Sequence, residues 1–115
     1  MHNDIPILQK IYDFYCELYL TVEKMPKKDK YILGGKIQKI TLDLMELIIT
    51  ASYAQRDNKV SFLNQAAVKL DLLKTLVRLT ENLHAIPTKK YLLLEEKLQE
   101  IGDNINFGML SVTRL

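Results

Sequence analysis

The sequence of 115 residues has no tryptophan, one cysteine, four glycines and three prolines. With so few residues that favour turns, we expect few turns and long regular segments. The single cysteine, Cys16, excludes an internal disulfide and fits a reducing compartment. No uncharged run approaches the about 20 apolar residues of a membrane-spanning helix, and residues 1–10 do not resemble a signal peptide. We therefore expect a soluble, cytoplasmic protein with no membrane association.

Residues that could catalyse a reaction or bind a metal are also scarce. The two histidines, His2 and His84, have no cysteine or carboxylate partners at metal-ligand spacing, and there is no E-x-x-H pair of the kind found in di-iron bundles. The acids Glu95, Glu96 and Glu100 are typical of a solvated helix face. We predict no catalytic residue, no metal site and no cofactor.

The chain does contain a long helical repeat, which is clearest in residues 29–52. Apolar residues recur there at alternating spacings of four and three, the pattern of a helix packed along its length in a left-handed bundle. Asp29 is the expected N-cap. Similar repeats predict helices at about 6–23, 58–84 and 88–105, followed by a C-terminal tail at 106–115. The predicted core positions are Leu8, Ile11, Tyr15, Leu18, Val22, Leu33, Ile37, Ile40, Leu44, Leu47, Ala51, Leu63, Ala66, Leu70, Leu73, Val77, Thr80, Tyr91, Leu94, Leu98, Ile101 and Ile105.

Short breaks between these segments determine the predicted fold. Four helices joined by short loops predict a single domain, residues 1–115, that forms an all-α, antiparallel, up-down-up-down four-helix bundle. In that topology the first break, at residues 24–28, lies at the same end as the third break, at residues 84–88. Residues on either side of these two breaks are therefore expected to meet.

Basic residues gather around that end. Between Lys24 and Lys39 there are six lysines and a single acid, Asp29. Cations near a helix N-terminus oppose its macrodipole, so local stability does not explain them, whereas an anionic partner would. The predicted nucleic-acid-binding residues are Lys24, Lys27, Lys28, Lys30, Lys36, Lys39, Lys74, Arg78, Lys89 and Lys90.

Two features beside these lysines each allow two interpretations. Tyr31 could stack on a base, but packing in the core is the preferred interpretation. The Gly34-Gly35 pair indicates either close packing of helices or the close approach of another backbone or a phosphate. No strand precedes the pair and no third glycine follows at the required spacing, which excludes a dinucleotide-binding fingerprint.

The apolar surface is wider than a single bundle core requires. In residues 58–84, Leu72, Leu76, Leu79 and Leu83 lie beside the core positions and extend the apolar arc to about 200°. In residues 6–23, the aromatic side chains of Tyr12, Phe14 and Tyr19 lie outside the core repeat. Monomers rarely expose such patches to water, so we predict a closed homo-oligomer in which they are buried between subunits.

One enzyme-like pattern competes with this view. Arg78 and His84, with five residues between them, resemble the R-x(4-6)-H motif of the HEPN family of dimeric helical RNases. On one continuous helix, however, these two side chains would point about 120° apart. Leu79 also stands where HEPN motifs usually carry a polar residue. We therefore prefer a protein without enzymatic activity.

A second resemblance covers most of the chain. Residues 25–37, MPKKDKYILGGKI, resemble the signature F-P-K-x-x-R-Y-x-L-G-x-(K/R)-I of a four-helix-bundle family. Residues 51–54, 69–79 and 90–102 agree with the rest of that family's pattern. The family contains the accessory variability determinant (Avd) proteins of diversity-generating retroelements and the proteins encoded in intervening sequences of large-subunit ribosomal RNA. The family's usual ending contains a tryptophan, which this chain lacks.

The resemblance implies a non-enzymatic accessory protein. Avd relatives are described as barrel-like homopentamers with a basic surface, which associate with a reverse transcriptase and with RNA or DNA during mutagenic copying. The intervening-sequence relatives have no settled activity, and the sequence does not select between the two branches. A third hypothesis is a protein-only assembly module whose lysines maintain solubility.

Overall fold

The computed structural model describes residues 6–113, with side chains through Met109, and every regular element within this range is helical. Four long helices, α1 (Pro6–Glu23), α3 (Gly35–Tyr53), α4 (Arg56–Asn82) and α5 (Thr88–Thr113), form an elongated molecule of 47 × 21 × 19 Å. The predicted all-helical bundle is confirmed. Between α1 and α3 lie the short helix α2 (Lys27–Asp29) and the π-helix η2 (Lys30–Gly34).

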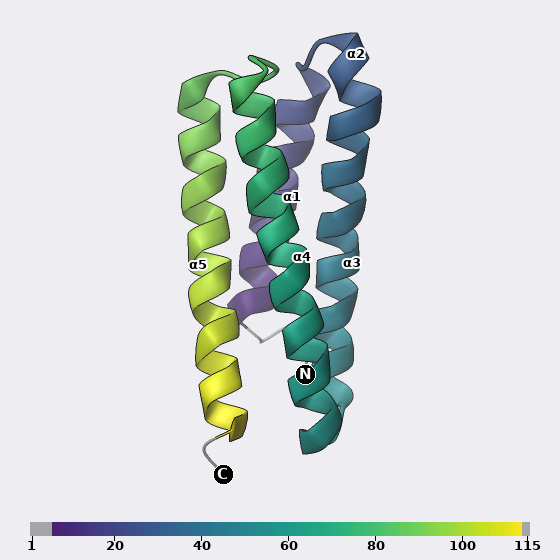
Figure 1. Ribbon diagram of the computed structural model, residues 1–115, viewed down its shortest axis with the longest axis vertical. Coiled ribbons are helices and arrows are strands. Elements are labelled where there is room, and N and C mark those ends of the chain that lie inside the picture. The colour runs from purple at the N-terminus through teal and green to yellow at the C-terminus, as the bar shows by residue number, and fades with distance from the viewer. Residues whose placement is uncertain (1–5, 114–115) are drawn as a thin grey trace.

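The helices pack in a ring. Helices α1 and α4 each contact both α3 and α5, so each long helix has two principal neighbours. Figure 1 shows the connection between α1 and α2 at the same end of the bundle as the connection between α4 and α5. The turn between α3 and α4 lies at the opposite end (Figure 1). The first and third breaks of the sequence therefore lie at the same end of the bundle.

The interior is apolar over the length of the bundle. In α4, the six buried residues are the six that the sequence predicts: Leu63, Ala66, Leu70, Leu73, Val77 and Thr80. The hydroxyl group of Thr80 donates a hydrogen bond to the carbonyl oxygen of Val77 at 2.6 Å, and the buried Thr41 donates to Ile37 at 2.8 Å. Both buried hydroxyl groups thus bond to their own helix, which avoids the cost of an unpaired buried donor.

Three of the core predictions in α1 and α3 are wrong by one position, and in the first of them Ile7 packs against the core in place of the predicted Leu8. Phe14 is fully buried, whereas the predicted core residue Tyr15 is only partly buried. In α3, Ile48 is 3% exposed and takes the place predicted for Leu47, which only packs against the edge of the core. Phe14 therefore cannot contribute to a surface between subunits, and the prediction that placed it there is corrected.

The predicted continuous helix from Asp29 is interrupted. The chain becomes helical at Lys27, directly after Pro26, and the Asp29 side chain forms no capping hydrogen bond. The backbone N–H of Gly35 then bonds to the carbonyl oxygen of Lys30, five residues earlier, which is the π-helical pattern. Asp29 is thus the last residue of α2 and does not serve as an N-cap.

The C-terminal part of the chain is more regular than predicted. Helix α5 continues to Thr113, so most of the tail expected at residues 106–115 is helical. Gly102 is fully enclosed, and a Cβ atom there would lie 3.1 Å from Leu70 Cδ2. This glycine allows α4 and α5 to pack closely, and it does not end the helix.

Candidate nucleic-acid interface

The predicted basic residues fall into two groups by position. Lys24, Lys27, Lys28 and Lys30 lie around α2, and Lys89 and Lys90 open α5 at the same end of the bundle (Figure 1). Arg78 lies in the last turns of α4, close to this end. We call these residues the basic end: Lys24, Lys27, Lys28, Lys30, Arg78, Lys89 and Lys90. Three acids, Glu23, Asp29 and Glu81, belong to the same segments.

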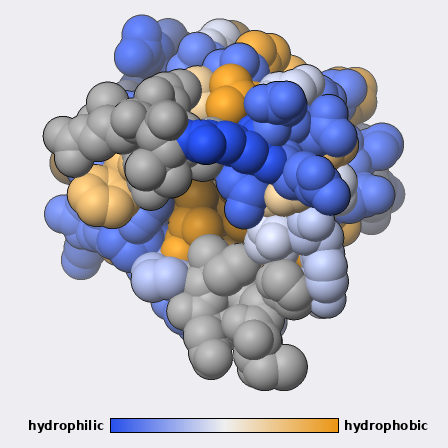
Figure 2. All heavy atoms as spheres, turned by 90° about the horizontal axis from the view of Figure 1, so that it is seen from below, coloured by the Kyte–Doolittle hydropathy of each residue, from blue (hydrophilic) through white to orange (hydrophobic). Residues whose placement is uncertain are grey.

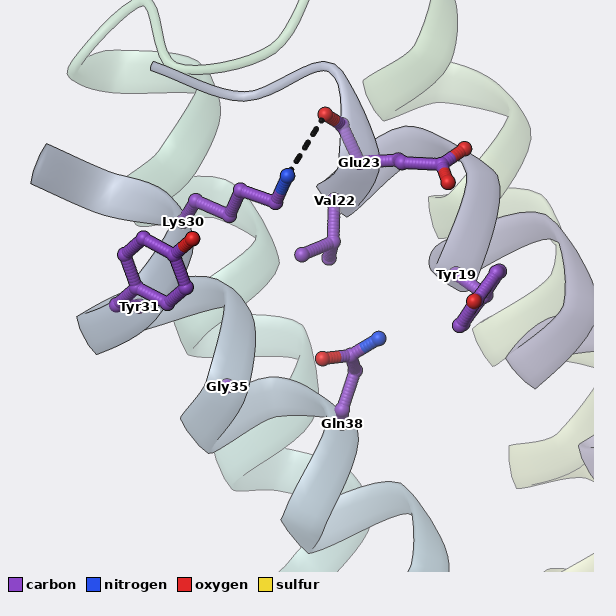
Figure 3. A pocket seen from close by; sticks show the side chains of 7 residues that line it. All are labelled: Tyr19, Val22, Glu23, Lys30, Tyr31, Gly35 and Gln38. Carbon is purple, nitrogen blue, oxygen red and sulfur yellow. Dashed lines mark hydrogen bonds between the residues drawn. The ribbon is translucent and has the colours of Figure 1, made fainter. Parts of the chain in front are cut away.

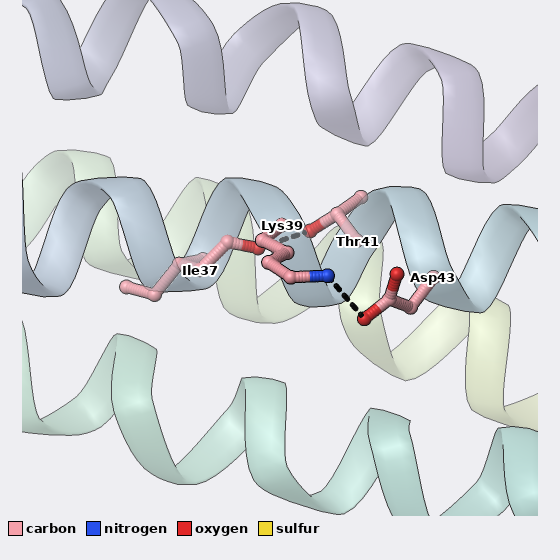
Figure 4. Close-up of polar contacts among 4 residues, drawn as sticks. All are labelled: Ile37, Lys39, Thr41 and Asp43. Carbon is pink, nitrogen blue, oxygen red and sulfur yellow. Dashed lines mark hydrogen bonds and ion pairs between the residues drawn. The ribbon is translucent and has the colours of Figure 1, made fainter.

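Lys36, Lys39 and Lys74 lie farther along the helices. At 1.5 Å of rise per residue, Lys36 is about 13 Å along the chain from the start of α2, and Lys74 is about 12 Å from the end of α4. The Lys39 ammonium group pairs with Asp43 at 3.5 Å on the same helix (Figure 4). Lys74 donates to the side-chain oxygen of Gln99 at 3.5 Å, which links α4 to α5. These three residues are on the flank of the basic end.

Two lysines of the basic end already have partners. Lys90 forms an ion pair with Glu17 at 3.2 Å, which joins the start of α5 to α1. Lys30 Nζ donates a hydrogen bond to the backbone carbonyl oxygen of Glu23 at 3.2 Å, at the end of α1 (Figure 3). In the described part of the chain, no ion pair engages Lys24, Lys27, Lys28 or Lys89, and all four are exposed. Their ammonium groups are therefore available to an anion.

Helix dipoles explain part of the positive charge. Helices α1 and α4 end at the basic end, and the negative ends of their dipoles favour nearby cations. Lys30 uses this effect directly, because it bonds to one of the last carbonyl groups of α1. Local stability therefore accounts for part of the positive charge, and the expectation that it accounts for none is wrong. The helices that end here favour cations, whereas the helix that begins here does not.

A cavity of about 300 Å³ lies between the end of α1 and the start of α3. Seven residues line it: Tyr19, Val22, Glu23, Lys30, Tyr31, Gly35 and Gln38. Figure 3 shows Tyr31 and Tyr19 on opposite sides, with Gln38 between them. The side chain of Tyr31 is 71% exposed, so the preferred prediction that it packs in the core is wrong. The sequence also gave no indication that Gln38 contributes to a cavity.

The two glycines beside this cavity have different roles. A Cβ atom on Gly34 would lie 2.6 Å from Val22 Cγ1, so Gly34 allows η2 to pack closely against α1. A Cβ atom on Gly35 would have no neighbour within 4 Å, and Gly35 lines the cavity. Close helix packing therefore explains Gly34, whereas Gly35 is adjacent to open space.

The apolar surface predicted for subunit contacts is still exposed. Leu72 and Leu79 on α4 are each 38% exposed, and Leu83, directly after α4, is 53% exposed. Tyr12 and Tyr19 on α1 are 58% and 53% exposed. Leu76 is partly buried against the core. These side chains, without Phe14, remain available to a neighbouring molecule.

The residues of the RNase-like motif do not share a helix. Helix α4 ends at Asn82, and His84 follows it with a positive φ of 59°, a left-handed conformation. The expectation that Arg78 and His84 lie on one continuous helix is therefore wrong, and the angle calculated from the helical period does not apply. Both side chains are exposed.

Comparison with protein families agrees with the signature in residues 25–37. The bAvd-like family model matches residues 5–111, which is nearly the whole chain. The chain belongs to the bAvd-like family. No curated protein sequence matches this bAvd-like protein.

Two further properties concern only residues 6–113 of this bAvd-like protein. Within that range, no three His, Cys, Asp or Glu side chains are close enough together to bind a metal ion. None of its helices combines the length and apolar character that spanning a bilayer requires. His2 lies outside the described residues.

Proposed function

We propose that this bAvd-like protein is a non-enzymatic accessory protein that binds RNA or DNA through its basic end and associates with the reverse transcriptase of a diversity-generating retroelement. The antiparallel, up-down-up-down order of the helices is part of the proposal, because this order brings the two basic breaks together. The main support is a set of exposed lysines that form no ion pair with any described residue: Lys24, Lys27, Lys28 and Lys89. Lysine ammonium groups contact phosphates as point charges, so the binding is largely independent of sequence.

Assembly into a closed homo-oligomer, a pentamer by family resemblance, completes the proposal. The exposed leucines at positions 72, 79 and 83 and the exposed Tyr12 of α1 form apolar surfaces of the kind that subunits bury. Tyr19 borders a cavity and is left out of this proposed contact. A ring would repeat the basic end in every subunit. Several subunits could then contact one strand, and each added contact would increase the overall affinity.

The test is charge reversal at the basic end. In a variant with Lys24, Lys27 and Lys28 all replaced by glutamate, we expect weaker binding to single-stranded RNA and DNA. Losing three phosphate contacts should flatten the slope of log affinity against log salt by about 2. Fluorescence anisotropy over a series of salt concentrations measures both quantities. A matched triple reversal at Lys59, Lys69 and Lys97, which lie outside the basic end, should have a much smaller effect.

Other results would favour the alternative functions. If the two triple variants lost nucleic-acid affinity equally, only the net charge of the protein would matter for binding. If the native protein binds neither RNA nor DNA at low salt, or has a monomeric mass by light scattering at micromolar concentration, the proposal fails. RNA cleavage that is lost in His84→Ala would support the HEPN-like RNase. A reverse-transcriptase gene next to the coding gene would favour the retroelement branch over the intervening-sequence branch.

A further inference from the structure

The cavity between α1 and α3 differs chemically from the lysines around it. Its volume of about 300 Å³ is at the lower end of the range of small-molecule sites, roughly 300–1,000 Å³. Its lining combines two tyrosines, one amide, one carboxylate and one ammonium group. A site for a phosphate alone would not need aromatic side chains, whereas a site for an apolar peptide would not need a lysine.

The wall on the α3 side is open enough for a flat group to approach the backbone. Gly35 has no side chain, and no atom lies within 4 Å of the position that its Cβ would occupy. Val22, which is 5% exposed, forms an apolar surface next to it. Gly34 allows α1 and η2 to pack in close contact beside the cavity.

Aromatic side chains border the cavity and remain in water. Tyr31 projects from η2, and both Tyr31 and Ile32 in this turn are more than 70% exposed. Tyr19 borders the other side from α1 (Figure 3). Exposed aromatic rings beside basic residues are the usual platform for unpaired bases, because every base has a face that can stack.

Polar groups suited to a base and its phosphate complete the site. In Figure 3 the Gln38 amide points into the space between the tyrosines, and within residues 6–109 it has no hydrogen-bond partner. An amide can both donate to and accept from the edge of a base. The Lys30 ammonium group is held at the cavity by Glu23 and retains donors for a phosphate.

We propose that this cavity binds one unpaired nucleobase of a single-stranded nucleic acid, with Tyr31 stacking on the base and Gln38 bonding to its edge. The inference rests on the proposed function, which supplies binding of the backbone by the basic end. The cavity would distinguish single strands from duplexes, which the lysines alone do not. In a duplex the bases are paired and stacked internally, so they cannot enter the cavity.

The test separates base recognition from backbone binding. Anisotropy is measured with a short single-stranded oligonucleotide and with an abasic strand that has the same length and charge. We expect the native protein to bind the base-bearing strand about fivefold or more tightly than the abasic strand. Tyr31→Ala should remove this ratio and leave the abasic affinity and its salt slope unchanged. Gly35→Leu, which fills the cavity, should have the same effect.

Tyr53→Ala is the matched control. Tyr53 is 72% exposed, close to the value for Tyr31, and it ends α3 at the opposite end of the bundle. This substitution should leave the ratio unchanged. Equal native affinity for both strands, or a ratio that survives Tyr31→Ala, would overturn the cavity inference while the basic end still binds phosphates. If the native protein bound neither strand at low salt, the proposed function would fail as well.

Discussion

In the middle of the bundle each turn of helix buries an apolar side chain, whereas the turn formed by η2 exposes two large ones. Leu44, Leu73 and Leu98 are each no more than 1% exposed, but Tyr31 and Ile32 are 71% and 72% exposed. A π-helical turn contains an extra residue and shifts the side chains that follow it. Regular helices of the bundle also expose large apolar side chains on their outer faces, such as Val68 at 67%. The regular region supplies stability, and the irregular region leaves groups accessible to a ligand. π-Helical turns are often found at functional sites.

The opposite end of the bundle is also hydrophilic. Figure 2 shows polar side chains over most of the described surface there, with apolar side chains visible near the centre. Charges at this end and along the lower helices include both signs, as in the pair between Lys10 and Glu100 at 3.8 Å. The basic end is distinguished by an excess of one sign of charge beside an irregular helix.

The largest effect is expected from the regular region. Phe14 is fully buried, and Phe14→Ala should lower the free energy of unfolding by about 3–5 kcal/mol because it leaves a cavity in the core. Phe107→Ala, at a side chain that is 75% exposed, should change it by less than about 0.5 kcal/mol. Urea denaturation at one fixed protein concentration measures both values. If both variants lowered the free energy of unfolding by similar amounts, Phe14 would not belong to the core.

The regular helices could be predicted because one period applies to the whole helix. In α4 the spacing of leucine, alanine and valine identified every buried position, since no residue disrupts the repeat from Leu63 to Thr80. In α3 the alternating spacing of four and three predicted Leu47 as a core residue, but Ile48 faces the core. A strict heptad drifts by about 20° per repeat on a straight helix, which is enough to exchange adjacent positions at the edge of the core.

The irregular segment could not be predicted from the helical period, because it depends on a contact between residues that are separated in the sequence. The short distance from Gly34 to Val22 depends on how η2 crosses α1, and no local pattern encodes it. Tyr31 lies in the same π-helical turn. The basic end could be predicted, because it depends only on the order of the helices and the positions of the lysines. The partner of Lys90 could not, since Glu17 lies 73 positions away in the sequence.

The two glycines test the irregular region directly. Gly34→Ala places a methyl group 2.6 Å from Val22 Cγ1, and overpacking of this kind should cost about 1–3 kcal/mol of unfolding free energy. Gly35→Ala meets open space and should increase stability by up to about 1 kcal/mol, because alanine favours helix. Thermal and urea unfolding measure both changes.

A double variant supplies the control for this pair. Combining Gly34→Ala with Val22→Ala removes the clash, so the combined loss should be smaller than the sum of the two single losses. Additive losses would show that Val22 is not what excludes a side chain at position 34. A stabilising Gly34→Ala would mean that the close packing of η2 against α1 is not required.

The smallest effect concerns two adjacent lysines at the basic end. Lys89 is exposed and no ion pair in the described part of the chain engages it, whereas Lys90 pairs with Glu17 at 3.2 Å. Lys89→Met should lower nucleic-acid affinity and flatten its salt slope by about 0.7, the share of one phosphate contact on a single strand.

Replacing Lys90 and Glu17 together by methionine keeps the net charge constant and should leave affinity near the native value. A double-mutant cycle on this pair should give a coupling of no more than about 1 kcal/mol, as expected for a partly exposed ion pair. If the paired replacement weakened binding as much as Lys89→Met does, Lys90 would be contacting the nucleic acid despite its ion pair. The division of the basic end into engaged and available lysines would then be wrong.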